Sequence, residues 1–504
     1  MRMMRCRKAS LPLPPLLTAS CPLLRSPCAW TARASFPRPR GSLLPKLKTF
    51  LPNSFNCQKA ITMPHPHDRR AIRGSYITFR ANPFDVPAHD ALVYEEDGLI
   101  IMEHGRITHC GAYASLHGLL GDNTPLTHYP DSLISAGFID AHVHYPQISA
   151  IASWGEQLLP WLEQYIFPTE AEFSNKDVAR QTARFFLSEL LRNGTTTAAV
   201  YCTVHPQSVD AFFEESARLG TRMIAGKVLM DRNCPPNLRD TAQSGYDQSK
   251  DLISRWHGKD RQLYAVTPRF AITSTPEQLE LAGDLLRSTP GLYMQTHLAE
   301  NLDEMAAVRS LFPNHASYLD VYAKAGLDGP RAIFGHGIHM TEHDFAHCHH
   351  SGCTLAHCPT SNLFLGSGSF RLFEALNPAR PVHVALGTDV GAGTSLSLLA
   401  TMGEAYKVSL MAGDARLSAI QALWLATAGA ARALHLHEQI GRIAPGMEAD
   451  LCVMDPAATP LMAQRTARCT SLSERLFALM VLGDDRAIRA TWANGRPVYE
   501  KPLD

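Results

Sequence analysis

The chain has 504 residues, which exceeds the length at which one hydrophobic core usually stops growing, so at least two domains are expected. Hydrophobic residues make up 45% of the sequence and charged residues 19%, a balance that supports a large core and excludes a mostly disordered chain. The 47 basic and 47 acidic residues cancel, yet about 11 of the basic residues precede Met63 and no acidic residue precedes Asp68. The remainder is therefore acidic, which argues against nucleic-acid binding.

Residues 1–62 are rich in Arg, Ser, Pro and Leu and contain no acidic residue, a composition typical of an organellar transit peptide. Three prolines between positions 12 and 15 interrupt the apolar stretch, which makes a secretory signal less favoured. Alternatively, translation begins at Met63 and the upstream residues are not part of the native protein. With either interpretation we expect this leader to lie outside the fold.

Cysteine usage and hydropathy indicate the compartment. Twelve cysteines are few for this length and lack paired Cys-x-x-Cys spacing, so we interpret them as reduced thiols of a cytoplasmic protein. No uninterrupted apolar run approaches the about 20 residues that a membrane helix needs, so no membrane partner is expected.

After the leader, short strand-like runs separated by glycines predict a β-rich segment over residues 63–134. The runs are Ile72–Phe79, Ala91–Val93, Leu99–Glu103 and Arg106–Cys110. The next segment, residues 135–438, alternates apolar, β-branched runs with amphipathic stretches. Its eight strand candidates are Ser135–His144, Gly194–Cys202, Met223–Met230, Leu263–Arg269, Leu292–His297, Ala332–His336, Thr354–Cys358 and Val382–Asp389. Helix-like stretches include Lys176–Leu191, Pro276–Leu286 and Leu302–Leu311, and Ala-rich helical sequence runs from Ser397 to Leu434.

Buried strands that alternate with helices predict a parallel sheet, and eight such units predict an α/β fold built on a (β/α)8 TIM-type barrel. Residues 439–504 return to strand-like sequence at Ala449–Met454 and Ile488–Val498, where Asn494-Gly495 predicts a hairpin. We therefore expect one small β-sandwich built from both termini, residues 63–134 and 439–504.

Polar residues occur where the predicted barrel strands end. His142 and His144 alternate on the first strand, so both side chains face the same way. His297, His336 and Asp389 follow the fifth, sixth and eighth apolar runs. The carboxyl ends of the strands form the catalytic rim of such barrels, and imidazole and carboxylate are ligands that zinc accepts. These five residues predict a metal site at that rim.

A second group of metal-binding residue types lies between positions 347 and 358. It contains His347, Cys348, His349, His350, Cys353, His357 and Cys358. Their irregular spacing does not match a zinc finger, and we regard a structural metal there as the weaker alternative.

Several motifs resemble the amidohydrolase superfamily, namely Ser135–His144, Thr296–Glu300, Gly335-His336 and Leu386–Asp389. Others resemble its guanine deaminase family, namely His144–Gln147, Leu159–Glu163, Pro268–Phe270, Ala356–Asn362 and Asp389–Gly393. The resemblance covers nearly everything after about Ala71.

This resemblance implies one zinc ion per subunit, with His336 beside the bound water. The implied ligands are His142, His144, His297 and Asp389. Related enzymes with two metals use a carboxylated lysine at the end of the fourth strand, where this chain has Arg269. Lys227, on the third strand, leaves a second metal open as an alternative.

The resemblance also implies an activity, the hydrolytic deamination of guanine to xanthine and ammonia. Asp389 would take a proton from the zinc-activated water, and Glu300 would carry protons to the purine and to the departing amine. Glu300, Asp389 and His336 are thus the predicted catalytic residues.

Guanine offers the acceptors O6 and N7 to the donor-only Arg269, while Gln147 both donates and accepts. Phe270, Trp154 and Trp161 are candidates to cover the ring faces, although for the tryptophans ordinary packing within their loop is an equal alternative. The remaining residues expected to contact guanine are His144, His297, Glu300 and Asp389. A homodimer is implied by the resemblance alone.

Two alternatives remain. Another hydrolase of this superfamily, a deaminase or dechlorinase acting on a different ring, would share the metal ligands but lack the combination of Gln147, Arg269 and Phe270. A non-catalytic scaffold relative would have lost metal ligands, and none is missing here.

Overall fold

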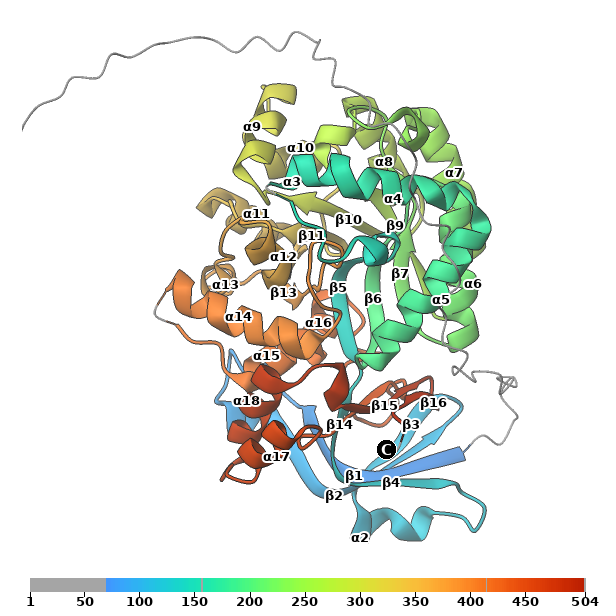
Figure 1. The fold of residues 1–504 in the computed structure, drawn as a ribbon, viewed down its shortest axis with the longest axis vertical. Helices are drawn as coiled ribbons and strands as arrows, with labels where there is room; N and C mark the ends of the chain where they lie inside the picture. Colours follow the sequence, from blue (N-terminus) through green and yellow to red (C-terminus); the bar gives the residue numbers. More distant parts are fainter. Residues whose placement is uncertain (1–68, 156, 414, 503–504) are drawn as a thin grey trace, which may run out of the picture. The chain divides into compact units, whose positions relative to one another are not determined.

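The computed structural model describes residues 69–155, 157–413 and 415–502, all in the larger of the chain's two units, residues 61–504. The predicted leader, residues 1–62, lies outside the described residues. Eight parallel strands pair in chain order to form the predicted barrel (Figure 1). They are β5 (Phe138–His144), β6 (Thr195–Tyr201), β7 (Arg222–Gly226), β9 (Gln262–Pro268), β10 (Tyr293–Leu298), β11 (Ala332–His336), β12 (Thr354–His357) and β13 (His383–Leu386), and a short β8 (Val228–Leu229) also pairs with β9.

Backbone hydrogen bonds beyond the end of β13 close the barrel. Asp389 N–H donates to the carbonyl of His142 at 2.8 Å, and His144 N–H donates to the carbonyl of Val390 at 3.0 Å. The segment that follows β13 is thereby joined to β5. The predicted (β/α)8 class is confirmed.

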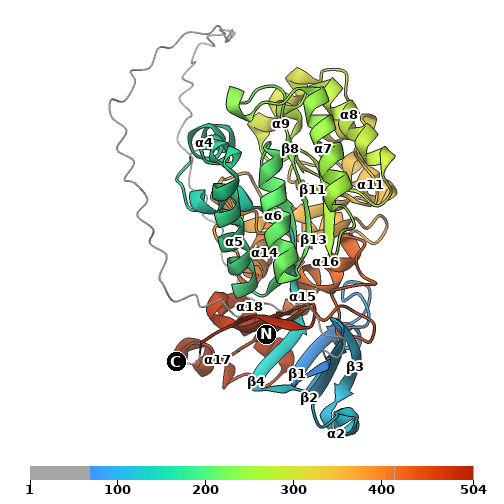
Figure 2. The ribbon, with the colours of Figure 1, turned by 90° about the vertical axis from the view of Figure 1, so that its right-hand side faces the viewer.

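Helices surround these strands, and Figure 2 shows α5 to α8 on the outer side of the barrel. They are α5 (Lys176–Arg192), α6 (Pro206–Leu219), α7 (Ala242–Trp256), α8 (Pro276–Ser288), α9 (Leu302–Leu311), α10 (Tyr318–Lys324), α11 (Glu342–Ser351), α12 (Pro359–Phe364), α13 (Leu372–Ala375), α14 (Leu398–Ala412), α15 (Ala419–Ala426) and α16 (Ala428–Ala433). Side-chain caps stabilise the first turns of several of these helices, and α7, α9 and α11 have capping boxes at Thr241, Asn301 and Thr341. Because helices cover the outer face and side chains fill the interior, β5, β6 and β7 are buried along their whole length.

A long segment of short helical turns follows β5 and leads to α5. It comprises η2 (Tyr145–Ala150), α3 (Leu158–Trp161), the π-helical turn η3 (Leu162–Ile166), α4 (Phe167–Ala171) and η4 (Glu172–Ser174). This segment supplies several side chains to the site described below.

Both ends of the described chain build a second sheet, in the order β16-β15-β14-β4-β1-β2-β3. Its strands are β1 (Arg69–Phe79), β2 (Leu92–Glu103), β3 (Arg106–Ala112), β4 (Leu126–Ala136), β14 (Leu451–Met454), β15 (Ile488–Ala493) and β16 (Arg496–Glu500). Apolar side chains from both ends, such as Ile100 and Trp492, share one buried cluster. Asn494 and Gly495 form the predicted hairpin turn with positive φ values of 52° and 72°.

Three details of the strands differ from the sequence-based expectations. Ser135 and Ala136 belong to β4 rather than to the barrel, because Gly137 separates β4 from β5; a Cβ there would lie 2.2 Å from Oγ1 of Thr196. β4 was not predicted, because Pro130 lies within it, next to an irregularity in the pairing of β4 with β1. Finally, β2 is one strand of 12 residues rather than two short runs.

The segment between β14 and β15 is helical, which the sequence analysis did not predict. It contains α17 (Pro460–Thr466) and α18 (Leu472–Leu482). The ring of Phe477 on α18 packs edge-to-face on Tyr406 of α14, with centroids 5.1 Å apart. The carboxyl-terminal segment therefore also contacts the helices of the barrel. None of the helices in the described ranges is long and apolar enough to cross a membrane.

A buried ion-pair cluster joins the barrel to the terminal sheet. Arg222 at the start of β7 and Arg261 just before β9 both donate to the carboxylate of Glu448, with Nε to Oε2 distances of 2.9 and 3.1 Å. Arg261 also pairs with Asp450. All four side chains are at most 10% exposed.

Candidate active site

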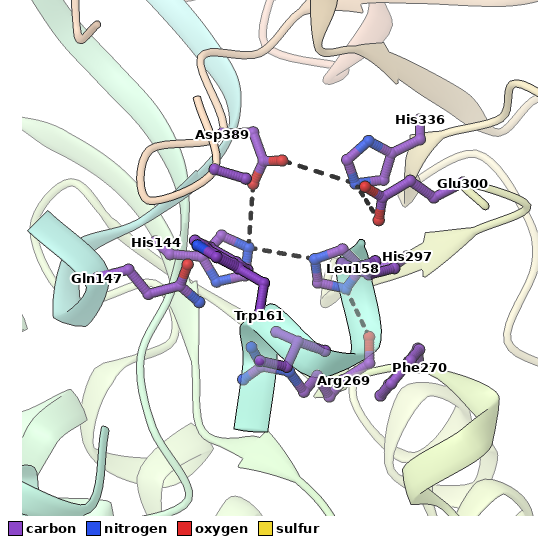
Figure 3. Close-up of a pocket in the computed structure, with 12 residues that line it drawn as sticks. His144, Gln147, Leu158, Trp161, Arg269, Phe270, His297, Glu300, His336 and Asp389 are labelled. Carbon is purple, nitrogen blue, oxygen red and sulfur yellow. Dashed lines mark hydrogen bonds and ion pairs between the residues drawn. The ribbon is translucent and has the colours of Figure 1, made fainter. Parts of the chain in front are cut away.

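Four predicted ligands meet at the carboxyl ends of the barrel strands. Nε2 of His142 lies 3.3 Å from Oδ1 of Asp389. Nε2 of His144 lies 3.3 Å from the same oxygen and 3.2 Å from Nε2 of His297 (Figure 3). The four ligand atoms all lie within 4.8 Å of one another. Three imidazoles and one carboxylate therefore surround a space that a metal ion can fill.

Hydrogen bonds on the far side of two rings fix their orientation. Nδ1–H of His297 donates to the backbone carbonyl of Arg269 at 2.7 Å, which leaves Nε2 directed at the cluster. Nδ1 of His336 lies 2.9 Å from Oδ1 of Asn362 and donates to it. Nε2 of His336 then faces Glu300 at 3.4 Å and Asp389 at 3.8 Å.

The backbone around Asp389 is held by a second, buried carboxylate. Asp140 accepts from the amide of His142 at 3.2 Å and from the amide and hydroxyl of Thr388 at 3.0 and 2.5 Å. Burial raises the pKa of Asp140 to about 6. Asp389 and His336 adopt left-handed backbone, with φ values of 51° and 71°, a conformation that costs non-glycine residues about 1 kcal/mol or more. Both residues are thus held in strained positions that direct their side chains into the site.

Burial and neighbouring charges set the ionisation of the cluster. Burial lowers the pKa of His144 to about 3 and that of His297 well below its usual value, so both rings are neutral. Burial alone would raise the pKa of Asp389, but the adjacent imidazoles lower it well below its usual range. Neutral imidazoles around an ionised carboxylate are the protonation states that a divalent cation requires.

A cavity opens beside the cluster. Its lining consists of His144, Gln147, Leu158, Trp161, Leu162, Arg269, Phe270, His297, Glu300, His336, Asp389 and Ala392. Figure 3 shows Trp161 and Leu158 approaching from the segment after β5. Trp154, by contrast, is 69% exposed and does not line the cavity, so its predicted place on a ring face is wrong.

Glu300 carries a carboxyl group into the cavity from just before α9. Its backbone amide donates to Oε2 of Glu304 at 2.8 Å, and Glu304 itself belongs to the capping box of α9. The Ser367 hydroxyl donates to Oε1 of Glu300 at 3.3 Å. Burial and the charge of Asp389 raise the pKa of Glu300 to about 8, so this carboxyl group holds a proton at neutral pH.

Comparison with known proteins agrees with this geometry. Residues 133–498 match the model of the "Amidohydrolase family". The chain belongs to the amidohydrolase family. Guanine deaminase of Escherichia coli K12 is 47% identical over 442 residues, which cover 87% of this chain and all of that protein. Its solved structure has a TM-score of 0.84 to this one and covers 86% of this chain and 100% of its own. A guanine deaminase from C. acetobutylicum with guanine bound in its active site has a TM-score of 0.76 at 29% identity, covering 86% of this chain and 100% of its own.

The cluster of this amidohydrolase fits a metal ion on its own chemistry. Nε2 of His142, the ring nitrogen that faces Asp389, is buried without a hydrogen-bond partner among the described residues. Orphaned imidazole nitrogens next to a buried carboxylate are costly unless a cation occupies the space between them. Lys227 does not contribute, because its fully buried Nζ pairs with Asp240 and donates to the carbonyl of Val228 at 3.3 Å. The alternative of a second metal on Lys227 is therefore disfavoured.

The structure brings all nine predicted site residues together. They are His142, His144, Gln147, Arg269, Phe270, His297, Glu300, His336 and Asp389. The candidate site between positions 347 and 358 does not assemble: within the described residues its ligand types yield no metal group of their own, and His347 instead pairs with Asp328 at 2.9 Å. Cys358 alone approaches the site, in a group with His336 and Asp389.

Sequence reasoning missed Glu170 and Asp140. Asp140 had a signal, because it alternates with His142 and His144 on one strand. Glu170 has no such signal in the sequence, because its hydrogen-bond partners Gln147 and Arg269 lie 23 and 99 positions away.

Proposed function

We propose that this chain is a zinc-dependent guanine deaminase that hydrolyses guanine to xanthine and ammonia. The observation that carries the proposal is one cavity that adjoins the three-histidine, one-aspartate cluster and is also lined by Arg269 and Gln147, two buried side chains suited to a purine edge. The 47% identity to the E. coli guanine deaminase over its full length supports the choice of substrate.

His142, His144, His297 and Asp389 would hold the zinc ion, one per subunit. A bound zinc ion supplies the nucleophile, because it lowers the pKa of water toward neutrality. Asp389 is ionised and accepts at its carboxylate the proton that the attacking water gives up. His336, fixed by Asn362, orients the carboxyl groups of Glu300 and Asp389 around the point of attack.

Glu300 acts as the proton carrier. Since its pKa is raised, it begins protonated and donates to the purine ring nitrogen as oxygen adds to C2. The ionised Glu300 then takes the remaining proton of the added oxygen and passes it to the exocyclic nitrogen, so that the C2–N bond breaks. The proton held by Asp389 returns Glu300 to its protonated form. Water thus contributes oxygen to xanthine, and the amine departs as ammonia.

Arg269 and Gln147 bind the substrate by its polar edge, with Arg269 donating to the acceptors O6 and N7. Phe270 and Trp161 lie on the cavity wall and cover the faces of the planar ring. His144, His297, Glu300 and Asp389 surround the reacting carbon.

We expect a cytoplasmic homodimer, in keeping with the sparse cysteines and with the family resemblance. Light scattering coupled to size exclusion tests the dimer, and metal analysis of purified protein tests the single zinc.

The decisive experiment follows ultraviolet absorbance and ammonia release when the zinc-loaded protein is mixed with guanine, with adenine and cytosine as controls. Rapid conversion of guanine alone, abolished by a chelator, is the expected result. Zinc-bound protein that leaves guanine intact would refute the proposed substrate and favour a hydrolase of another ring.

A further inference from the structure

Glu170 connects the two side chains that face the purine edge. It lies on α4 and its side chain is fully buried. Its two oxygens each accept from Nη1 of Arg269 at 2.8 Å, and Oε1 also accepts from Nε2 of Gln147 at 3.0 Å. One carboxylate therefore orients both groups before any ligand arrives.

Two residues of α4 contact the guanidinium group of Arg269. The guanidinium pairs with Glu170 and its carbon lies 5.4 Å from the ring centroid of Phe167, the first residue of α4. Among the described residues, Nε and Nη2 of Arg269 have no acceptor. These N–H groups remain available to a ligand in the cavity that Arg269 lines.

Glu170 also decides which end of the Gln147 amide points to it. A carboxylate paired with arginine accepts hydrogen bonds and has none to donate, so the amide must turn its NH₂ group toward Glu170. Reversing the amide would place two acceptor oxygens against each other. Within the described part of the chain, Oε1 of Gln147 receives no hydrogen bond, and it remains as an acceptor for a ligand.

We propose that Glu170 is a positioning residue that sets the hydrogen-bonding polarity of the cavity, with Gln147 presenting an acceptor and Arg269 presenting donors. This inference rests on the proposed function and specifies its selectivity. The preferred ligand carries a ring N–H beside a carbonyl oxygen, as guanine does at N1 and O6. Adenine has the reverse pattern, an amino donor beside a ring acceptor, and leaves donors facing Arg269.

The test is the isosteric variant Glu170→Gln, assayed for guanine kinetics, for xanthine affinity by calorimetry and for zinc content. The new amide donates to Oε1 of Gln147 and turns the Gln147 NH₂ group toward the ligand. We expect KM for guanine and Kd for xanthine to rise about 10- to 100-fold, as for loss of a hydrogen bond to a charged group, with kcat changed much less and zinc retained. Glu172→Gln, an exposed residue on the same segment, is the matched control.

The double variant Gln147→Glu/Glu170→Gln separates polarity from packing. The carboxylate introduced at position 147 accepts from the amide introduced at position 170 and again presents an oxygen acceptor to the ligand, so the double variant should regain at least part of the lost affinity. If Glu170→Gln does not fold, Glu170→Asp carries the same comparison, because it retains the charge but shortens the reach to Gln147.

Unchanged KM and Kd in the single variant, or a double variant no better than the single one, would overturn the role of Glu170 while the guanine activity of the wild type stands. A wild type that binds xanthine but does not convert guanine would overturn the activity and still report on Glu170 through Kd. A wild type that neither binds xanthine nor converts guanine would overturn both.

Discussion

Two opposing effects act on the pKa of Glu300. Burial and the charge of Asp389 raise its pKa to about 8, whereas the hydroxyl of Ser367 lowers it by donating to the carboxylate. The capping box of α9 holds its backbone through Glu304, whose own pKa burial raises to about 7. The protonated form of Glu300 is thus a property of its position, and two predictions test it.

Glu300→Gln should retain zinc and the fold but lose about 10²- to 10⁴-fold in kcat, because the amide fills the same space and cannot transfer protons. Steady-state turnover of guanine, with metal analysis and thermal melting on the same sample, gives the result. Glu280→Gln, on the exposed face of α8, serves as the control. Turnover near that of the wild type would exclude Glu300 as the proton carrier.

Ser367→Ala should shift the alkaline limb of the pH–kcat profile upward by up to about one pH unit. Glu300 must be protonated to donate, so activity falls as pH rises through its pKa, and removing a donor to the ionised form raises that pKa. A bound cation lowers the value in both proteins, so the difference between them is the measured quantity. Ser369→Ala, two residues away, should leave the limb in place, and an unshifted limb in Ser367→Ala would contradict the contact.

Residues with a local periodic signal were predictable from sequence. His142 and His144 alternate on one strand, and His297 and Asp389 follow apolar runs, so barrel geometry alone gathers them. Asp140 shared that alternation and was overlooked. Trp154 was misplaced, because a position on a long loop does not determine whether a ring points inward.

At the scale of elements, the barrel strands were predictable because burial on both faces leaves a continuous apolar run. β4 was not, since Pro130 interrupts its pattern and its partners β1 and β14 lie far away in sequence. The helices α17 and α18, which lie between β14 and β15, were not predicted either. What the sequence could not show was how the barrel and the terminal sheet are joined.

That junction depends on Glu448, which accepts from Arg222 and Arg261 in a buried setting. Glu448→Gln should lower the free energy of unfolding by about 3–5 kcal/mol, because two guanidinium groups lose most of their compensating charge. Urea denaturation measures the loss, and Glu438→Gln, exposed on the same segment, is the control. Equal stability of the two variants would show that the cluster contributes little.

The same cluster predicts a pH dependence. Burial alone would raise the pKa of Glu448, but the hydrogen bonds and charges of Arg222 and Arg261 lower it below its usual 4.5. The stabilisation is therefore complete above about pH 4.5 and is lost as pH falls through the lowered value. In Glu448→Gln, the free energy of unfolding should lack this decrease at acidic pH.

For the molecule as a whole, the three-histidine, one-aspartate cluster predicts that metal binding adds stability as well as chemistry. Chelation should abolish guanine turnover and lower Tm by several degrees, since a ligand at 100 times its Kd stabilises the folded state by about 2.7 kcal/mol. Added zinc should restore both. His142→Ala, which lacks one ligand, should show a smaller chelator-dependent change in Tm; an equal change would place the stabilising metal elsewhere.

The sheet shared by the two termini has a consequence for biosynthesis. The indole N–H of Trp492 donates to the hydroxyl of Tyr129, a residue 363 positions earlier, and β4 pairs directly with β14. During translation, β1 to β4 leave the ribosome long before their carboxyl-terminal partners exist. Until synthesis ends, the edge of β4 that will pair with β14 is open to other chains, so nascent or truncated forms of this protein should depend on chaperones far more than the finished enzyme does.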